Sequence, residues 1–272
     1  MTFIPAIPMG GYAGWALLKR TMDRQTAAQS ATKEFKLDED YFREKIGKIN
    51  TADELVSDRR LLKVALGAFG LDGDINNKFF IKKVLGDGTL TVGALANRLA
   101  DKQYQKLSAA FGFGDFSIPR NKLSDFADKI RPAYRARQFE KAVGSQNDDL
   151  RLALNTQREL PGIASKSGSS EDARWFTVMG NAPLRKVFEK ALGLPASLGI
   201  LDLDRQLKTF KAKAQSQLGN SSITQFSDPA KAEDLVRRFL ARSESEALSN
   251  QASAGSAALE ILQQVASRSR RL

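Results

Sequence analysis

The sequence predicts an all-α protein, a multi-helix array that contains a repeated helix–Gly–helix unit. Apolar residues recur at helical intervals of three, four and seven through most of the chain, whereas strand-type alternation is rare. A helix-ending motif also occurs twice. The chain has 272 residues, 42% of them hydrophobic and 27% charged, which is typical of a folded globular protein.

The repeated motif is Leu-x-Lys-Val-x-x-x-Ala-Phe/Leu-Gly-Leu, at residues 61–71 and 184–194. Six of the motif's eleven positions are identical, and a shorter version ends at Gly112. Glycine directly after a helix favours a left-handed closing turn, so we predict Gly70, Gly112 and Gly193 to be structural helix caps. The two long copies are consistent with two pseudo-repeats, although shared helix-ending chemistry explains them equally well.

The first half of the chain predicts six helices in order. Residues 12–30 form an Ala-rich segment, and Asp38 can cap a short helix through residue 46. Thr51 and Glu54 have capping-box spacing ahead of an apolar stripe that ends at Gly70, which predicts one helix over residues 51–70. Asp74 can start a helix that ends near residue 86, and residues 91–99 and 101–111 supply two more.

The second half begins with a longer helix from residue 123 that we expect to be bent or broken at Pro132. The Ser-rich stretch 165–170 predicts a boundary or loop. Helices over residues 183–192 and 203–218 follow, and Asp228 with Pro229 opens a further helix. We therefore expect an N-terminal helical segment (1–30), a first helical half (31–164), a second helical half (165–240) and a C-terminal tail (241–272).

Both ends of the chain carry thin apolar stripes. The N-terminal helix has Trp15, Leu18 and Met22 on one face. The tail has a sparse heptad-like pattern formed by Leu248, Ala252, Gly255, Leu259, Leu262 and Val265. An isolated helix of this quality is marginal in water. Our hypothesis is a partner interface formed by Trp15, Leu18, Met22, Leu248, Leu259 and Leu262; the alternative is that both helices pack onto the chain's own core.

Several classes of chemistry lack their usual residues. The chain has no Cys and no His, which excludes disulfides, thiolate or imidazole metal ligands and Ser–His or Cys–His nucleophiles. Residues 72–76 begin like a calcium loop, but Lys83 stands where the bidentate Glu should be. No carboxylate pair is spaced as an acid/base couple. We expect no cofactor, no metal and no enzymatic activity.

The net charge is +11, which attracts nucleic acid or anionic surfaces. The basic residues are scattered and lack interleaved aromatics, so we do not expect nucleic acid to be the main partner. Residues 1–18 carry no charge, but proline and glycine interrupt them and Lys19 follows rather than precedes the apolar run. We expect no membrane insertion and a chain that is cytoplasmic at synthesis, with export without a cleaved signal as an open alternative.

Four blocks of the chain resemble an alphaproteobacterial family catalogued only as a domain of unknown function: Tyr12-Ala-Gly-Trp15-x-x-Leu18-x-x-Thr21, Tyr41-Phe42, the stretch from Asp58 to Ile75, and Leu99-Ala-Asp101-x-x-Tyr104. Genes of that family tend to lie among flagellar genes, and some members are named basal-body rod proteins. The resemblance implies a flagellar association and supplies no catalytic residue.

Three functions follow from these observations. The first is a non-enzymatic, flagellum-associated structural or assembly protein that acts through helix packing, with flagellar proteins or a second copy as partners. The second is a basic module that binds nucleic acid or an anionic surface. The third is a glycan hydrolase that uses Asp and Glu alone, which would require two facing carboxylates in a cleft.

Overall fold

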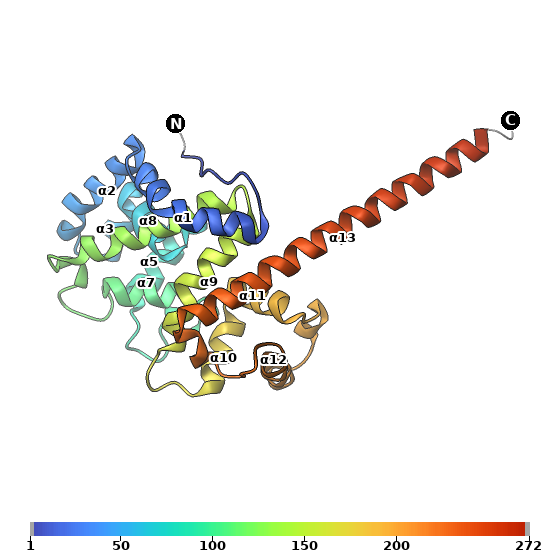
Figure 1. The fold of residues 1–272 in the computed structure, drawn as a ribbon. Helices are drawn as coiled ribbons and strands as arrows, with labels where there is room; N and C mark the ends of the chain where they lie inside the picture. The colour runs from blue at the N-terminus through green and yellow to red at the C-terminus, as the bar shows by residue number, and fades with distance from the viewer. Residues whose placement is uncertain (1–2, 270–272) are drawn as a thin grey trace. The chain divides into compact units, whose positions relative to one another are not determined.

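The computed structural model describes residues 3–269, and it describes their side chains except those of Ala196 and of residues 251–269. The described chain is all-α and contains no strand (Figure 1). Its α-helices are α1 (Gly11–Ser30), α2 (Lys33–Lys45), α3 (Ala52–Ser57), α4 (Arg59–Phe69), α5 (Lys78–Asp87), α6 (Leu95–Arg98), α7 (Gln103–Phe111), α8 (Phe126–Gly144), α9 (Asp148–Ala164), α10 (Glu171–Gly180), α11 (Ala182–Leu192), α12 (Leu203–Leu218) and α13 (Pro229–Ser269). Five short 3₁₀ helices join them: η1 (Ile46–Lys48), η2 (Asp72–Asp74), η3 (Arg120–Lys122), η4 (Ala196–Ile200) and η5 (Ile223–Ser227).

The chain folds into two compact units. Unit 1 contains residues 1–7 and 17–146, and unit 2 contains residues 8–16 and 147–272. Helix α1 therefore contributes its first six residues to unit 2 and the rest to unit 1. The expected boundary at 165–170 lies instead inside unit 2, because α9 packs against α11 and α13 and belongs with them.

Unit 1 is built around α4. Leu61, Val64 and Ala65 of this helix are fully buried, and α4 packs mainly against α8. Phe35 of α2 stacks on Tyr134 of α8, with the ring centroids 4.9 Å apart. Glu39 of α2 receives two hydrogen bonds from Arg135 of α8, at 2.6 and 2.5 Å. An apolar core and a buried ion pair thus hold α2, α4 and α8 together.

Unit 2 is built around an aromatic cluster. Trp175 of α10 lies edge-on to Phe188 of α11, with the centroids 5.5 Å apart, and it also contacts Phe210 of α12. Phe226 of η5 completes the cluster against Phe188. Helix α13 covers α11 through Phe239 and neighbouring apolar residues. The core of this unit therefore lies between α9, α10, α11, α12 and the first four turns of α13.

The two long motif copies close their helices in the same way. Gly70 and Gly193 have φ values of 74° and 64°. In both turns the N–H of the residue after glycine donates to the carbonyl five residues earlier, from Leu71 to Leu66 at 2.9 Å and from Leu194 to Glu189 at 2.8 Å. These are Schellman closures. Gly112 also ends its helix in the left-handed conformation, with φ 69°.

Gly70 and Gly193 also lie close to an arginine each. A Cβ at Gly70 would collide with the guanidinium of Arg137 on α8, and a Cβ at Gly193 would collide with that of Arg242 on α13. A guanidinium near the C-terminal end of α4 or α11 interacts favourably with the negative end of the helix dipole. Glycine is therefore favoured at both positions by its backbone conformation, and a Cβ would in addition displace the end of an arginine side chain.

Two predicted helices of unit 1 need correction. Helix α2 begins at Lys33, and Asp38 lies inside it, buried and bound to Lys63 at 2.7 Å, rather than at its N-terminus. The single helix expected over residues 51–70 is divided into α3 and α4. Asp58 divides it, because this residue leaves the helical conformation and its carboxylate accepts hydrogen bonds from the backbone N–H groups of Arg60 and Leu61. Thr51 caps α3 as its spacing predicts.

Helix α8 is not broken at Pro132, which corrects one of the two outcomes expected there. Helix α8 continues past this residue for twelve positions, because Tyr134, Phe139 and Val143 of the later turns are buried. The packing of these side chains outweighs the hydrogen bond that proline cannot make. The second half of α8 and the whole of α9 were not predicted, although Asn147 caps α9 by accepting a hydrogen bond from the N–H of Leu150.

Candidate functional site

The beginning of α1 and helix α13, both in unit 2, meet at one carboxylate. Glu233 of α13 accepts a hydrogen bond from the indole Nε1 of Trp15 at 3.0 Å and from the hydroxyl of Tyr12 at 3.3 Å. Gln157 of α9 donates to its second oxygen at 3.0 Å. Trp15 is fully buried. Glu233 therefore satisfies three donors from two other segments and attaches the N-terminal segment to α13.

A second contact between α1 and α13 lies three turns further along α13. Gly11 is the first residue of α1 and has a φ of 62°. The carboxylate of Glu244 lies so close to Gly11 that a Cβ there would collide with it. A carboxylate at a helix N-terminus interacts favourably with the helix dipole. Two acidic residues of α13, eleven positions apart, thus hold the beginning of α1.

Beyond this contact α13 leaves the packed part of unit 2. Ser243 is its last buried residue among those described, and all side chains from Glu244 to Asn250 are exposed. Leu248 is 62% exposed. The helix continues to Ser269 (Figure 1). We define the α13 extension as residues 244–269 and regard it as the candidate interaction site.

The structure separates the residues of the predicted partner interface. Trp15 and Leu18 are buried, and Met22 is half-buried, so the N-terminal stripe is not an exposed contact face. The expectation that this stripe contacts a partner is thereby corrected. The indole of Trp15 instead donates a hydrogen bond to Glu233 of the same chain. Leu248 is exposed, whereas the side chains of Leu259 and Leu262 lie outside the described residues. The stripe itself was visible in the sequence, but nothing marked Glu233 as its polar partner.

The turn that begins like a calcium loop is internally satisfied. Asp72 accepts hydrogen bonds from Gln138 at 2.7 Å and from Lys141 at 3.1 Å. Asp74 accepts one from the hydroxyl of Tyr104 at 2.5 Å, and burial together with this bond raises the pKa of Tyr104. Asp74 does not cap α5, which begins only at Lys78. Among the described residues, no group of three or more acidic side chains could hold a metal ion.

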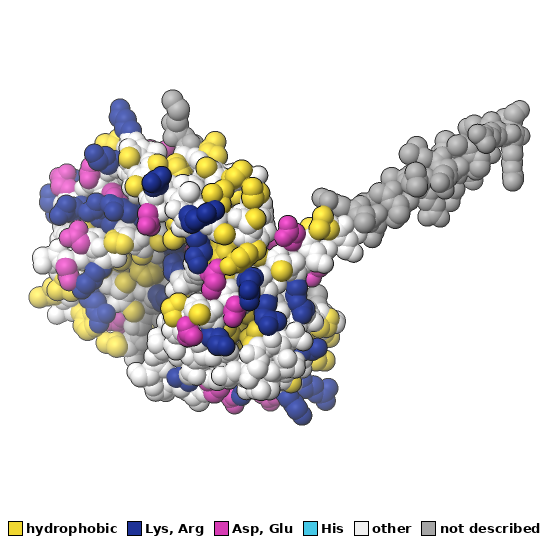
Figure 2. Space-filling view, in the orientation of Figure 1, with side chains coloured by type: hydrophobic (Ala, Val, Ile, Leu, Met, Phe, Trp, Pro, Cys, Tyr) yellow, Lys and Arg dark blue, Asp and Glu magenta, His cyan; other side chains and the backbone are white. Residues whose placement is uncertain are grey.

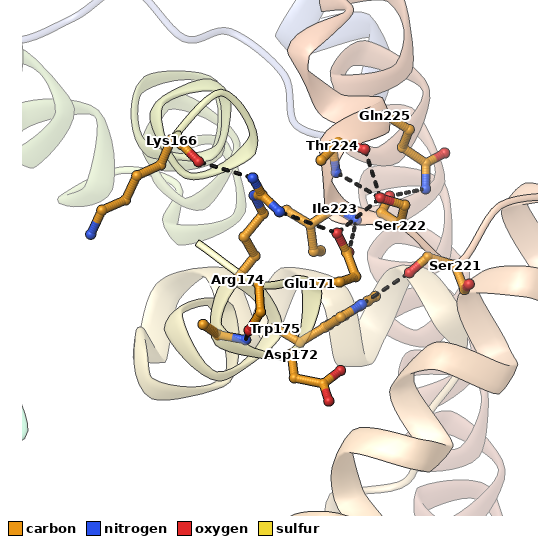
Figure 3. Close-up of polar contacts among 12 residues, drawn as sticks. Lys166, Glu171, Asp172, Arg174, Trp175, Ser221, Ser222, Ile223, Thr224 and Gln225 are labelled. Atoms are coloured by element: carbon orange, nitrogen blue, oxygen red, sulfur yellow. Dashed lines mark hydrogen bonds and ion pairs between the residues drawn. The ribbon is translucent and has the colours of Figure 1, made fainter. Parts of the chain in front are cut away.

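A polar cluster at the start of α10 looks superficially catalytic (Figure 3). Ser222 donates its hydroxyl proton to Glu171 at 3.0 Å, and the same carboxylate accepts from the backbone N–H of Ile223. Arg174 forms an ion pair with Glu171 at 3.6 Å and donates to the carbonyl of Lys166. The hydroxyl and the carboxylate are engaged with each other and with the backbone. The cluster therefore fixes η5 to α10.

Unit 1 has an open depression of about 430 Å³ between the start of α3 and α5. Its charged lining residues include Lys82, paired with Asp53 at 2.5 Å, and Lys83, paired with Asp87 at 3.0 Å. Phe79, 83% exposed, lies at this depression. The lysines are held by carboxylates of the same depression, so their charges are already balanced there.

Asp115 ties together two loops of unit 1. Its carboxylate accepts hydrogen bonds from the backbone N–H groups of Thr89 and Leu90, at 2.6 and 2.9 Å, and from the hydroxyl of Thr89 at 2.8 Å. Burial works against ionisation here, but these hydrogen bonds outweigh it and lower the pKa of Asp115. The loops carry the exposed apolar residues Val92 and Ile118.

Charged residues of both signs are interspersed over the face shown in Figure 2. Many of the basic side chains form ion pairs with carboxylates of the same unit, including Arg135 in unit 1 and Lys190 in unit 2. No helix within the described part of the chain has a stretch long and apolar enough to cross a bilayer.

The fold and the site thus define an all-α protein with two helical units, in which residues 244–250 of α13 are exposed. A family described as "Protein of unknown function (DUF1217)" matches residues 68–232, which is more than half of the chain, and the protein belongs to this family. The crystal structure of a protein from Agrobacterium tumefaciens has a similar fold. That protein is 25% identical, the match covers 87% of this chain and 94% of the other, and the TM-score is 0.70. No curated protein is significantly similar to the chain.

Proposed function

We propose that this protein is a non-enzymatic structural or assembly protein that acts through helix packing, and that it serves the flagellum. One observation carries the first part: α13 continues beyond its packing partners with Leu248 exposed. A helix without tertiary contacts is marginal in water, so a partner that covers its apolar residues would stabilise it. The partner surface is then the α13 extension, including Leu248, Leu259 and Leu262.

The flagellar part of the proposal comes from the sequence resemblance described above. It concerns the place where the protein acts and predicts which proteins bind to the α13 extension. A non-enzymatic role fits the polar cluster of Glu171 and Ser222, whose groups are bound to each other and to the backbone. The alternative of a basic binding module has weaker support, because basic residues are interspersed with acidic ones on the visible face (Figure 2).

A pair of neighbouring substitutions tests the surface. Leu248→Glu places a charge on the apolar stripe, whereas Ala247→Glu adds the same charge at an adjacent exposed position. In pull-downs from the native cell, we expect Leu248→Glu to lose flagellar partners and Ala247→Glu to retain them. Circular dichroism should show that both variants remain folded.

The proposal fails if a chain that ends at Ser243 recovers the same proteins as the full chain. It also fails if the bound material is removed by nuclease, because that result supports the basic module. Binding that falls steeply with salt would point the same way.

A further inference from the structure

Helices α8 and α13 correspond to each other in their respective units. Each packs on the helix of one motif copy, α8 on α4 and α13 on α11. Each places an arginine over the closing glycine of that helix, Arg137 and Arg242 respectively. Aligned at these arginines, the helices share three pairs of buried residues: Ala127 with Ala232, Ile130 with Leu235, and Tyr134 with Phe239.

The correspondence ends at the α13 extension. Six residues after the arginine, α8 has Val143, which is fully buried, whereas α13 has Leu248, which is 62% exposed. Helix α8 ends at Gly144, one residue later, but α13 runs on to Ser269. An apolar position that is covered in unit 1 is therefore uncovered in unit 2, at the point where α13 becomes longer than its counterpart.

The apolar stripe of the extension continues from Leu248 in alternating steps of four and three through Ala252, Gly255, Leu259 and Leu262, and the next step of four reaches Ala266, one residue after Val265. This is the spacing of the a and d positions of a coiled coil. In an antiparallel pair centred on residue 257, each leucine meets a small residue of the other copy: Leu248 with Ala266, Leu262 with Ala252, and Leu259 with Gly255. A parallel pair would instead contain layers of alanine or glycine alone, which fill little volume.

The charges favour the same orientation. The extension begins with Glu244, which also lies against Gly11, and Glu246, which also pairs with Lys190 at 3.2 Å. Arg268 stands near the other end of its sequence and is followed by Arg270 and Arg271. Antiparallel pairing brings the acidic beginning of one copy to the level of the basic end of the other. Parallel pairing would place like charges at the same level, which is unfavourable.

We propose that the α13 extension pairs with the extension of a second copy of this chain in an antiparallel two-helix coiled coil. This inference rests on the proposed function, because it names the partner of the same surface. The six core positions are few and half of them are small, so the pair is weak and its population rises with protein concentration.

Introduced cysteines test the orientation cleanly, because the chain has no thiol of its own. Ala252 and Leu262 lie in the same layer of the antiparallel pair. We expect chains with Ala252→Cys, mixed with chains carrying Leu262→Cys, to form a disulfide-linked dimer under mild oxidation. Ala252→Cys alone is the matched control: its two copies would lie about 15 Å apart, ten residues at 1.5 Å each, beyond the reach of a disulfide.

A crosslink with Ala252→Cys alone, or none in the mixture, overturns the antiparallel pair. Sedimentation of the unmodified chain provides a second measurement. The mass should rise towards twice 29.9 kDa with concentration, and a chain ending at Ser243 should stay at one copy. A full chain that stays monomeric at every concentration overturns this inference, yet leaves the proposed function standing if Leu248→Glu still loses other partners.

Discussion

The closing glycines of unit 2 allow a quantitative test of what stabilises its helix ends. Gly193 and Gly219 both end helices of unit 2 in the left-handed conformation, with φ values of 64° and 75°. Their surroundings differ: a Cβ at Gly219 meets nothing within 4 Å, whereas a Cβ at Gly193 collides with the guanidinium of Arg242. Alanine at Gly219 therefore reports backbone strain alone, and alanine at Gly193 reports strain plus displacement of the arginine.

The expected magnitudes follow from these two contributions. Left-handed conformation costs an alanine about 1–2 kcal/mol relative to glycine. Displacing Arg242 removes a cation from the C-terminal end of α11, which is worth about 0.3–1 kcal/mol. It also disturbs the hydrogen bond from Arg242 to Gln217 at 3.4 Å. We expect Gly219→Ala to lower the free energy of unfolding by about 1–2 kcal/mol and Gly193→Ala by about 0.3–1 kcal/mol more than Gly219→Ala.

Urea denaturation of the full chain, followed by far-UV circular dichroism and tryptophan fluorescence, measures both losses in the same unit. In an Arg242→Ala background the obstruction is gone, so Gly193→Ala should cost no more than Gly219→Ala. A double-mutant cycle then gives the coupling between Gly193 and Arg242. Equal losses in the native background, or a difference that persists without the arginine, would refute the reasoning.

Three further predictions concern single side chains. Trp15→Ala should destabilise the full chain by about 3–5 kcal/mol because it empties a buried aromatic site. Trp15→Phe should cost only about 1–2 kcal/mol, because it removes mainly the hydrogen bond to Glu233. Similar losses of the two variants in urea denaturation would contradict this prediction. Glu39→Gln should cost about 1.5–3 kcal/mol in thermal unfolding, since the buried carboxylate loses the charge that strengthens its hydrogen bonds from Arg135, which is itself 37% exposed. An unchanged Tm would count against a contribution of this ion pair. The backbone amide chemical shift of Thr89 should change with pH. The pKa of Asp115 is lowered, so the hydrogen bonds from Thr89 to its carboxylate are complete above the ordinary carboxyl pKa and are lost as pH falls through the lowered pKa. A chemical shift that does not change in acid, as expected for Asp115→Asn, would contradict this prediction.

Features with local causes could be predicted from the sequence. The all-α class follows from helical periodicity, and the helix ends at Gly70 and Gly193 follow from a residue that tolerates positive φ. The cap at Thr51 is local in the same sense. A break at Pro132, one of the two outcomes expected there, does not occur because residues that follow it in α8 are buried by distant parts of unit 1.

The candidate site could be predicted only in part. An apolar stripe shows that a helix has something to bury, but it does not show what covers it. The hydrogen-bond acceptor of Trp15 is Glu233, 218 positions away, and no sequence pattern links the two residues. The sequence shows that Leu248 is an apolar position on a helix. Only the structure shows that it is exposed, because α13 continues beyond Ser243, its last buried residue among those described.

The division of α1 between the units has a consequence for the order of folding. Residues 8–16 leave the ribosome more than 200 residues before Glu233, which accepts the hydrogen bonds of Trp15 and Tyr12. Domains usually fold during synthesis from the N-terminus onward. Unit 2 cannot be completed in this way, because its first segment must wait for α13. The nascent chain therefore carries Trp15 without its hydrogen-bond acceptor until α13 has been synthesised.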